Sequence, residues 1–135
     1  MRPTMRLQRR PLSPHLQIYR RTTTMTMSIL HRITGVGLYL GTLLLAWWLV
    51  AAAWGPDAYA TFQSFAGSPL GELILLGYLW ALVHHALGGL RHLVWDMGKG
   101  FDLPAANVMA QATLIGSIVL TAAAWVAGLF IKGAM

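Results

Sequence analysis

The sequence predicts an all-α integral membrane protein, with three transmembrane helices that follow an extended basic N-terminal arm. Two observations lead to this fold class. Of the 135 residues, 56% are hydrophobic and only 10% carry a charged side chain, whereas soluble domains carry about 25% charged residues. The apolar residues also gather into three long uncharged runs, each long enough to cross a hydrocarbon core about 30 Å thick.

Composition and charge exclude several other classes of protein. A disordered chain would be poor in apolar residues. The absence of cysteine rules out a disulfide, a thiolate nucleophile and an iron–sulfur or cysteine–zinc site on this chain. The formal net charge is +6, but seven of the ten Lys and Arg residues precede residue 33. No basic stripe therefore runs along a polar face, as nucleic-acid binding would require.

The predicted arm comprises residues 1–27. It contains Pro3, Pro11 and Pro14, which discourage helix. We therefore expect an extended segment over the cytoplasmic membrane surface. Its arginines would set the topology and attract anionic lipid, and docking to a partner protein is an open alternative.

The three uncharged runs cover residues 33–56, 73–90 and 103–131. No backbone polar group can stay unpaired in lipid, so each run should be an α-helix. With their polar ends included, the predicted spans lie at about 29–54, 71–95 and 105–131, within a transmembrane domain of residues 28–135.

The distribution of charge predicts the orientation of the spans. The first connection, residues 57–72, contains no Lys or Arg, whereas the second contains Arg91 and Lys99, and the C-terminal tail contains only Lys132. The positive-inside rule then puts the N-terminus and the second connection in the cytoplasm.

The second run contains ionisable side chains, which are costly inside a membrane and usually functional. His85 and His92 fall within about 20° of each other on one helix face, and His84 points about 100° away. His85 lies near mid-span, and small residues share its face. A stripe of that kind leaves a slot for a flat porphyrin, so His85 is the favoured axial ligand. These small neighbours are Gly77, Ala81, Gly88 and Gly89.

The small residues have a second interpretation, which is close helix packing with histidines that hydrogen-bond across helices. Both interpretations stay open on the residues alone. Zinc is disfavoured because it takes four ligands, whereas a haem needs one or two axial groups. The third run holds no ionisable residue, and we expect a packing helix with close contacts at Gly116 and Ala122–Ala124.

A hydroxyl, an imidazole and a guanidinium stand at the start of the first span, on Ser28, His31 and Arg32. They could hydrogen-bond the carbonyl oxygens of a quinone, whose tail would stay in lipid. A snorkelling Arg32 at the helix end is the alternative. The predicted topology puts these groups on the same membrane side as Arg91, His92 and Asp96, which favours a shared site.

Three motifs together resemble the cytochrome b membrane-anchor subunits of succinate dehydrogenase, respiratory complex II. They are Arg10-Pro-Leu-Ser-Pro-His-Leu-Gln-Ile-Tyr19, Ser28-Ile-Leu-His-Arg-Ile-Thr-Gly35, and HHALGGLRHLVWDMG at residues 84–98. The resemblance covers nearly the whole chain. One departure is the threonine run before Ser28, where several members of the family have a proline.

The resemblance implies a haem b shared with a second membrane-anchor subunit, which would supply the other axial histidine. His85 would then be this chain's ligand to the haem iron. His31 and Arg32 would lie near the haem propionates, and His92 and Arg91 could help to hold them. Ubiquinone would bind at Ser28, Ile29 and Arg32.

The implied function is that of a membrane anchor of succinate:quinone oxidoreductase. Electrons would come from an iron–sulfur subunit, which receives them from a flavoprotein subunit, and would reduce ubiquinone; no activity is expected of the isolated chain. The alternatives are a non-redox structural anchor or small transporter subunit, and a fumarate reductase running in reverse. Only nine residues precede Arg10, which is short for a transit peptide, so we expect a bacterial inner membrane rather than a mitochondrial one.

Overall fold

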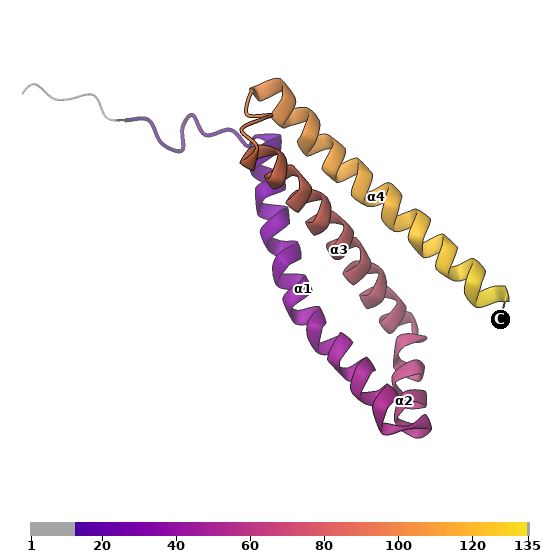
Figure 1. Ribbon diagram of the computed structural model, residues 1–135. Coiled ribbons are helices and arrows are strands. Elements are labelled where there is room, and N and C mark those ends of the chain that lie inside the picture. Colours follow the sequence, from indigo (N-terminus) through magenta and orange to yellow (C-terminus); the bar gives the residue numbers. More distant parts are fainter. Residues whose placement is uncertain (1–12, 135) are drawn as a thin grey trace, which may run out of the picture.

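The computed structural model describes residues 13–134, and over this part of the chain it contains four α-helices and no strand. Figure 1 shows α1 (Thr23–Trp54), α2 (Pro56–Ala66), α3 (Pro69–Asp96) and α4 (Leu103–Ala134). The helices α1, α3 and α4 are each long and apolar enough to cross a membrane. The predicted fold class, an all-helical protein with three spans, is confirmed.

The helix α1 begins at Thr23, so residues 23–27, which we assigned to the arm, are helical. Its cap is Thr22, whose Oγ1 accepts a hydrogen bond from the amide of Met25 at 3.2 Å, as N-cap threonines do. Residues 13–22 are non-helical, with one turn at residues 16–18. Several residues of the predicted arm lie outside the described residues, namely Arg2, Pro3, Arg6, Arg9, Arg10 and Pro11.

The short helix α2 lies in the segment that we treated as a connection. Gly55 has φ +125°, a conformation that favours glycine, and it turns the chain sharply at the end of α1. Pro56 then occupies the first turn of α2, where its fixed φ suits a helix start. Phe62 is buried against Trp47 of α1, with ring centroids 5.1 Å apart and nearly perpendicular planes. The helix α2 therefore packs back on the end of α1.

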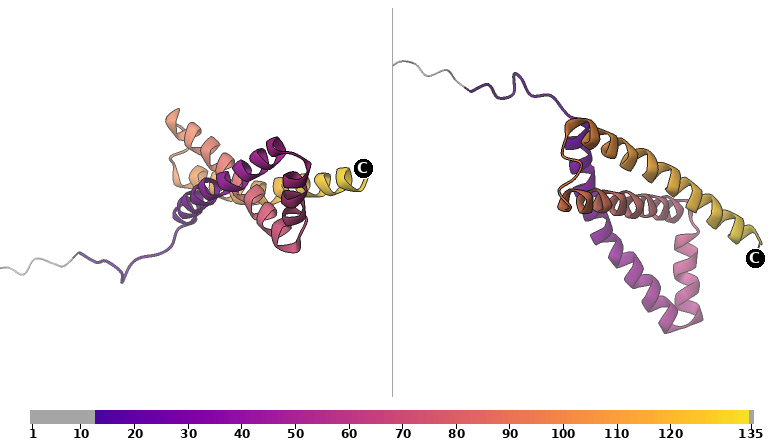
Figure 2. Two further views of the ribbon diagram at one scale, coloured as in Figure 1. Left: turned by 90° about the horizontal axis from the view of Figure 1, so that it is seen from below. Right: turned by 45° about the horizontal axis from the view of Figure 1, so that its top comes forward.

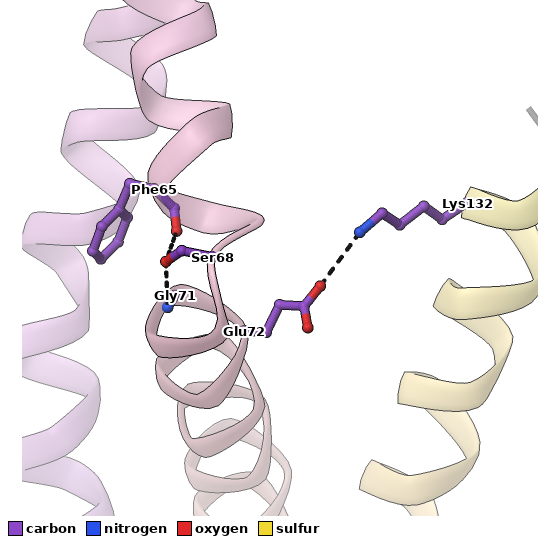
Figure 3. Close-up of polar contacts among 5 residues, drawn as sticks. All are labelled: Phe65, Ser68, Gly71, Glu72 and Lys132. Carbon is purple, nitrogen blue, oxygen red and sulfur yellow. Dashed lines mark hydrogen bonds and ion pairs between the residues drawn. The ribbon is translucent and has the colours of Figure 1, made fainter.

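The helix α3 starts with a capped turn (Figure 3). The Oγ of Ser68 accepts a hydrogen bond from the amide of Gly71 at 3.1 Å and donates one to the carbonyl of Phe65 at 2.6 Å. One turn later, Glu72 forms an ion pair with Lys132 of α4 at 3.3 Å. Both side chains are well exposed, so this pair contributes at most about 1 kcal/mol.

The helix α4 packs on α3 through a stripe of small side chains at spacings of three and four residues. The buried members are Ala106, Ala110, Thr113, Ser117 and Thr121. Gly116 contributes as we expected, because a Cβ there would lie 3.4 Å from Leu87. Ala122–Ala124 make no close contact within this chain, since all three residues are exposed. Three consecutive residues span most of a helical turn and cannot all face one neighbour.

The helices α1 and α3 pack through two glycines of α1. A Cβ at Gly37 would meet that of Ala81 at 4.0 Å, and the ring of Tyr78 occupies the space beside Gly41. Figure 2 shows that the long helices are closest at the end where α1 and α4 begin and α3 ends, and that they diverge from there. The candidate site residues lie at this convergent end.

Candidate functional site

Three histidines from two helices meet at the convergent end of the bundle. His31 of α1 stacks on His85 of α3, with ring centroids 3.9 Å apart and planes 9° from parallel. The ring of His92 lies 5.2 Å from that of His31 and is tilted by 46°. The structure thus gathers the three histidines that the sequence suggested for a cofactor.

Two glycines make room for the stacked rings. At Gly88 of α3, an added Cβ would overlap the ring of His31. At Gly35 of α1, an added Cβ would lie 3.0 Å from Cε1 of His85. Part of the small-residue stripe around His85 therefore serves the contact between α1 and α3. At Gly77 and Gly89, in contrast, no other group lies within 4 Å of an added Cβ.

Replacing Gly88 with alanine is expected to push the ring of His31 away and weaken the pairing of α1 with α3. Overpacking of this kind costs about 1–3 kcal/mol, more than the gain of up to about 1 kcal/mol from alanine's helix propensity. Thermal unfolding of the detergent-purified protein measures the loss. The control is Gly128→Ala, where no group lies within 4 Å of the added Cβ. Equal unfolding temperatures for the two variants would contradict the described packing.

The orientation of the His85 ring is set by α1. Its Nδ1 lies 3.0 Å from the carbonyl oxygen of His31 and 3.4 Å from Oγ1 of Thr34. A carbonyl only accepts hydrogen bonds, so Nδ1 carries the proton, and Nε2 of the neutral ring keeps its lone pair. Histidines that bind metals are commonly fixed in this way, through a hydrogen bond from the other ring nitrogen.

His84, the neighbour of His85 in the chain, has different partners. It is 1% exposed, and its Nδ1 lies 3.2 Å from Oγ of Ser117 on α4. The Ser117 hydroxyl donates to the carbonyl of Leu114 at 2.8 Å, so it accepts from His84. The ring of Trp80 lies 5.2 Å away. His84 is therefore a hydrogen-bonded histidine of the interface between α3 and α4.

The residues suggested for quinone binding lie on another face of α1. Ser28, Ile29 and Arg32 are exposed, and Arg32 is about 100° around the helix from His31. Within the described residues, the side chains of Ser28 and Arg32 make no hydrogen bond or ion pair. No contact in the described part of the chain brings these three residues together with His92 or Asp96, which are also exposed.

Arg91, which the sequence placed with the polar groups at this end of the protein, is a buried cation, and its enclosure did not follow from the sequence. It is 4% exposed, and its Nε and Nη1 have no hydrogen-bond partner in the described part of the chain. Its Cζ lies 5.1 Å from the centroid of the Trp95 ring. The enclosed Nδ1 of His31 also lacks a described partner. The groove that Arg91 lines is formed by α3 and α4, and the rotation of one helix against another cannot be read from the sequence of either.

These residues fit a haem better than a metal ion held by protein alone. Among the described residues, no group of three or more His, Cys, Asp or Glu side chains could hold a metal ion. A haem brings its own four ring nitrogens and needs only axial ligands. His85 has the matching feature, an Nε2 with a free lone pair on a ring fixed through Nδ1.

Comparisons with known proteins all indicate the same family. A family model described as the succinate dehydrogenase/fumarate reductase transmembrane subunit matches residues 6–124. The succinate dehydrogenase cytochrome b556 subunit of Paracoccus denitrificans is 49% identical over 111 residues, which cover 82% of this chain and 85% of the relative. The protein of the same name from Rickettsia felis is 38% identical over 118 residues, 87% of this chain and 92% of that one. The mitochondrial cytochrome b560 subunit of Sus scrofa is 37% identical over 116 residues, 82% of this chain and 63% of the relative.

Proposed function

This chain belongs to the family of succinate dehydrogenase/fumarate reductase transmembrane subunits, and on that premise we propose that it helps to hold a haem b and to form a ubiquinone-reduction site in a respiratory membrane complex. It is a transmembrane anchor of this family, and its relatives are succinate dehydrogenase cytochrome b556 subunits by name. Such an anchor does not oxidise succinate itself. Its contribution is to bind and orient groups within the membrane and at its surface.

The haem proposal rests on one observation, the hydrogen bond from Nδ1 of His85 to the carbonyl of His31 at 3.0 Å. It holds the ring in the tautomer whose Nε2 can bind iron. A haem bound there would supply one-electron redox chemistry. The second axial histidine would come from the other membrane-anchor subunit, and His31, Arg32 and His92 would offer donors to the propionates.

The quinone proposal rests on the exposed face of α1. Ser28 and Arg32 are one helical turn apart, so a hydroxyl and a guanidinium point to the same side. Both can donate hydrogen bonds to a quinone carbonyl oxygen, and Ile29, which is 45% exposed, offers an apolar contact. As electrons arrive, Arg32 would stabilise the negative charge that develops on this oxygen. The same exposed face remains open to the iron–sulfur subunit.

The complex would contain a flavoprotein subunit, an iron–sulfur subunit and two membrane anchors. We place it in a bacterial inner membrane, with the N-terminus in the cytoplasm. Relatives from Paracoccus and Rickettsia support the bacterial membrane, and the excess of basic residues before Ile33 supports the orientation.

A reduced-minus-oxidised optical spectrum of the detergent-purified complex tests the haem proposal. A low-spin b-type α band is expected, together with quinone reduction that is sensitive to ubiquinone analogues. A complex that assembles with all its subunits but shows no such band would refute the assignment of His85.

Replacing Thr34 with valine is expected to lower haem affinity by about tenfold or more, as loss of a group that orients a metal ligand usually does. Valine keeps the volume and removes the Oγ1 that lies 3.4 Å from Nδ1 of His85. Redox titration of the α band should also show a shifted midpoint potential. The control is Thr42→Val, because the exposed hydroxyl of Thr42 bonds only the carbonyl of Tyr39 in its own helix. If both variants bound haem with wild-type affinity and potential, Thr34 would have no part in orienting His85.

A further inference from the structure

A groove of about 230 Å³ lies between α3 and α4, near the end of α3. Its walls are mostly aliphatic and include Leu87, Leu90 and Val94 of α3 and Met109 and Ala112 of α4. Arg91 also lines it and contributes its only charge.

The guanidinium of Arg91 lacks the anion that its burial requires. Arg91 is 4% exposed, and its enclosed Nε and Nη1 have no partner in the described part of the chain. Burying a charge without a partner is strongly unfavourable. The described part of the chain therefore leaves these two buried donors without an acceptor.

The acidic residues of the chain do not supply that acceptor. All four lie in the described part, and the one ion pair formed there is Lys132 with Glu72 at the far end of α3. Asp102 instead uses its carboxylate to cap α4, accepting from the amide of Ala105 at 3.1 Å. Asp96 is exposed.

The groove opens on a different face of α3 from the one that His85 presents to α1. Arg91 follows His85 by six residues, which puts it about 120° around α3 and about 9 Å along it. His85 contacts α1 through His31, whereas the groove beside Arg91 opens against α4.

We propose that this groove binds a membrane phospholipid, with its phosphate on Arg91 and an acyl chain along the aliphatic walls. Guanidinium groups bind phosphate oxygens through paired hydrogen bonds. The guanidinium lies 5.1 Å from the ring of Trp95, near the end of α3, and tryptophan is typical of the level of lipid headgroups. The aliphatic walls match acyl chains, and the buried cation matches the phosphate.

The test is to count the phospholipid molecules that stay with the intact complex in mild detergent, by mass spectrometry of the extracted lipid. Arg91→Gln is expected to lose one phospholipid that the wild type retains. Vesicles of phosphatidylglycerol should raise the unfolding temperature of the delipidated wild type. The variant should need at least about tenfold more lipid for the same rise. Inorganic phosphate should have no such effect on either protein, because it cannot fill the groove.

Two further variants make the result decisive. Lys132→Gln removes an exposed cation at the other end of α4 and should retain the lipid. Ala112→Phe fills the groove while keeping Arg91, and it should lose the lipid with an unchanged haem spectrum. One result would overturn the proposal: Arg91→Gln keeps the wild-type lipid count but changes the haem spectrum or releases another subunit. The anion on Arg91 would then be a haem propionate or a carboxylate of that subunit. If Arg91→Gln failed to assemble, lipid retention by Ala112→Phe would overturn the proposal, and lipid loss would support it.

Discussion

Replacing His85 with tyrosine is expected to reduce the b-type α band of the purified complex to less than about a tenth of its wild-type intensity, because the change removes the proposed iron ligand. The phenol also lacks a nitrogen that could hold the hydrogen bond to the carbonyl of His31. The measurement is a reduced-minus-oxidised spectrum, normalised to the amount of this chain in the sample. Spectra of the other subunits show that the complex has assembled.

The matched control is His84→Asn, which changes the adjacent histidine. Asparagine can place its amide near the position of Nδ1 and keep a hydrogen bond to Ser117. We expect this variant to retain the α band, with some loss of thermal stability because the larger ring is fully buried. Tyrosine is not used at position 84, because its larger side chain would overpack this buried site and hide the effect of losing the imidazole. If His84→Asn lost the band and His85→Tyr kept it, the ligand assignment would be reversed.

Replacing Arg32 with alanine is expected to lower the rate of quinone reduction by about 10²-fold, the usual effect of losing a donor to a developing negative charge. Electron transfer from succinate to an artificial acceptor that takes electrons upstream should stay within about twofold of the wild type, since Arg32 is remote from that chemistry. The two assays on one preparation give the ratio directly.

Arg21→Ala serves as the control for Arg32. Arg21 is also an exposed arginine, but it precedes α1 and belongs to the non-helical segment. We expect its loss to leave both rates close to those of the wild type. Equal losses of both activities in Arg32→Ala would mean that Arg32 serves assembly, and the quinone site would then have to be sought elsewhere.

The long helices could be predicted from the sequence because their signal is strong and local. An uncharged run of 18 residues or more has few stable alternatives to a membrane-spanning helix. The helix α2 escaped prediction because it is short and mixed in polarity. Its start carried a recognisable signal, since Gly55 and Pro56 are followed by Asp57 in the first turn.

The site could be predicted only as far as it depends on one helix at a time. Angular spacing along α3 correctly placed His85 and His84 on different faces, and the predicted topology brought His31 to the same end as His92. The partners across helices could not be predicted, because they depend on how each helix is rotated against the next. For this reason neither the contact of His84 with Ser117 nor the enclosure of Arg91 followed from the sequence.

The adjacent pair His84 and His85 fixes the angular register of α3. One imidazole is bonded to a serine of α4 and the next to a carbonyl of α1, so turning α3 by a single residue breaks both bonds at once. His84 and His85 are therefore not interchangeable. Each histidine fixes α3 against a different helix, His84 against α4 and His85 against α1. Inserting one residue between positions 84 and 85 would turn everything beyond it by about 100°, and the second imidazole would leave α1 although its sequence motif remained intact.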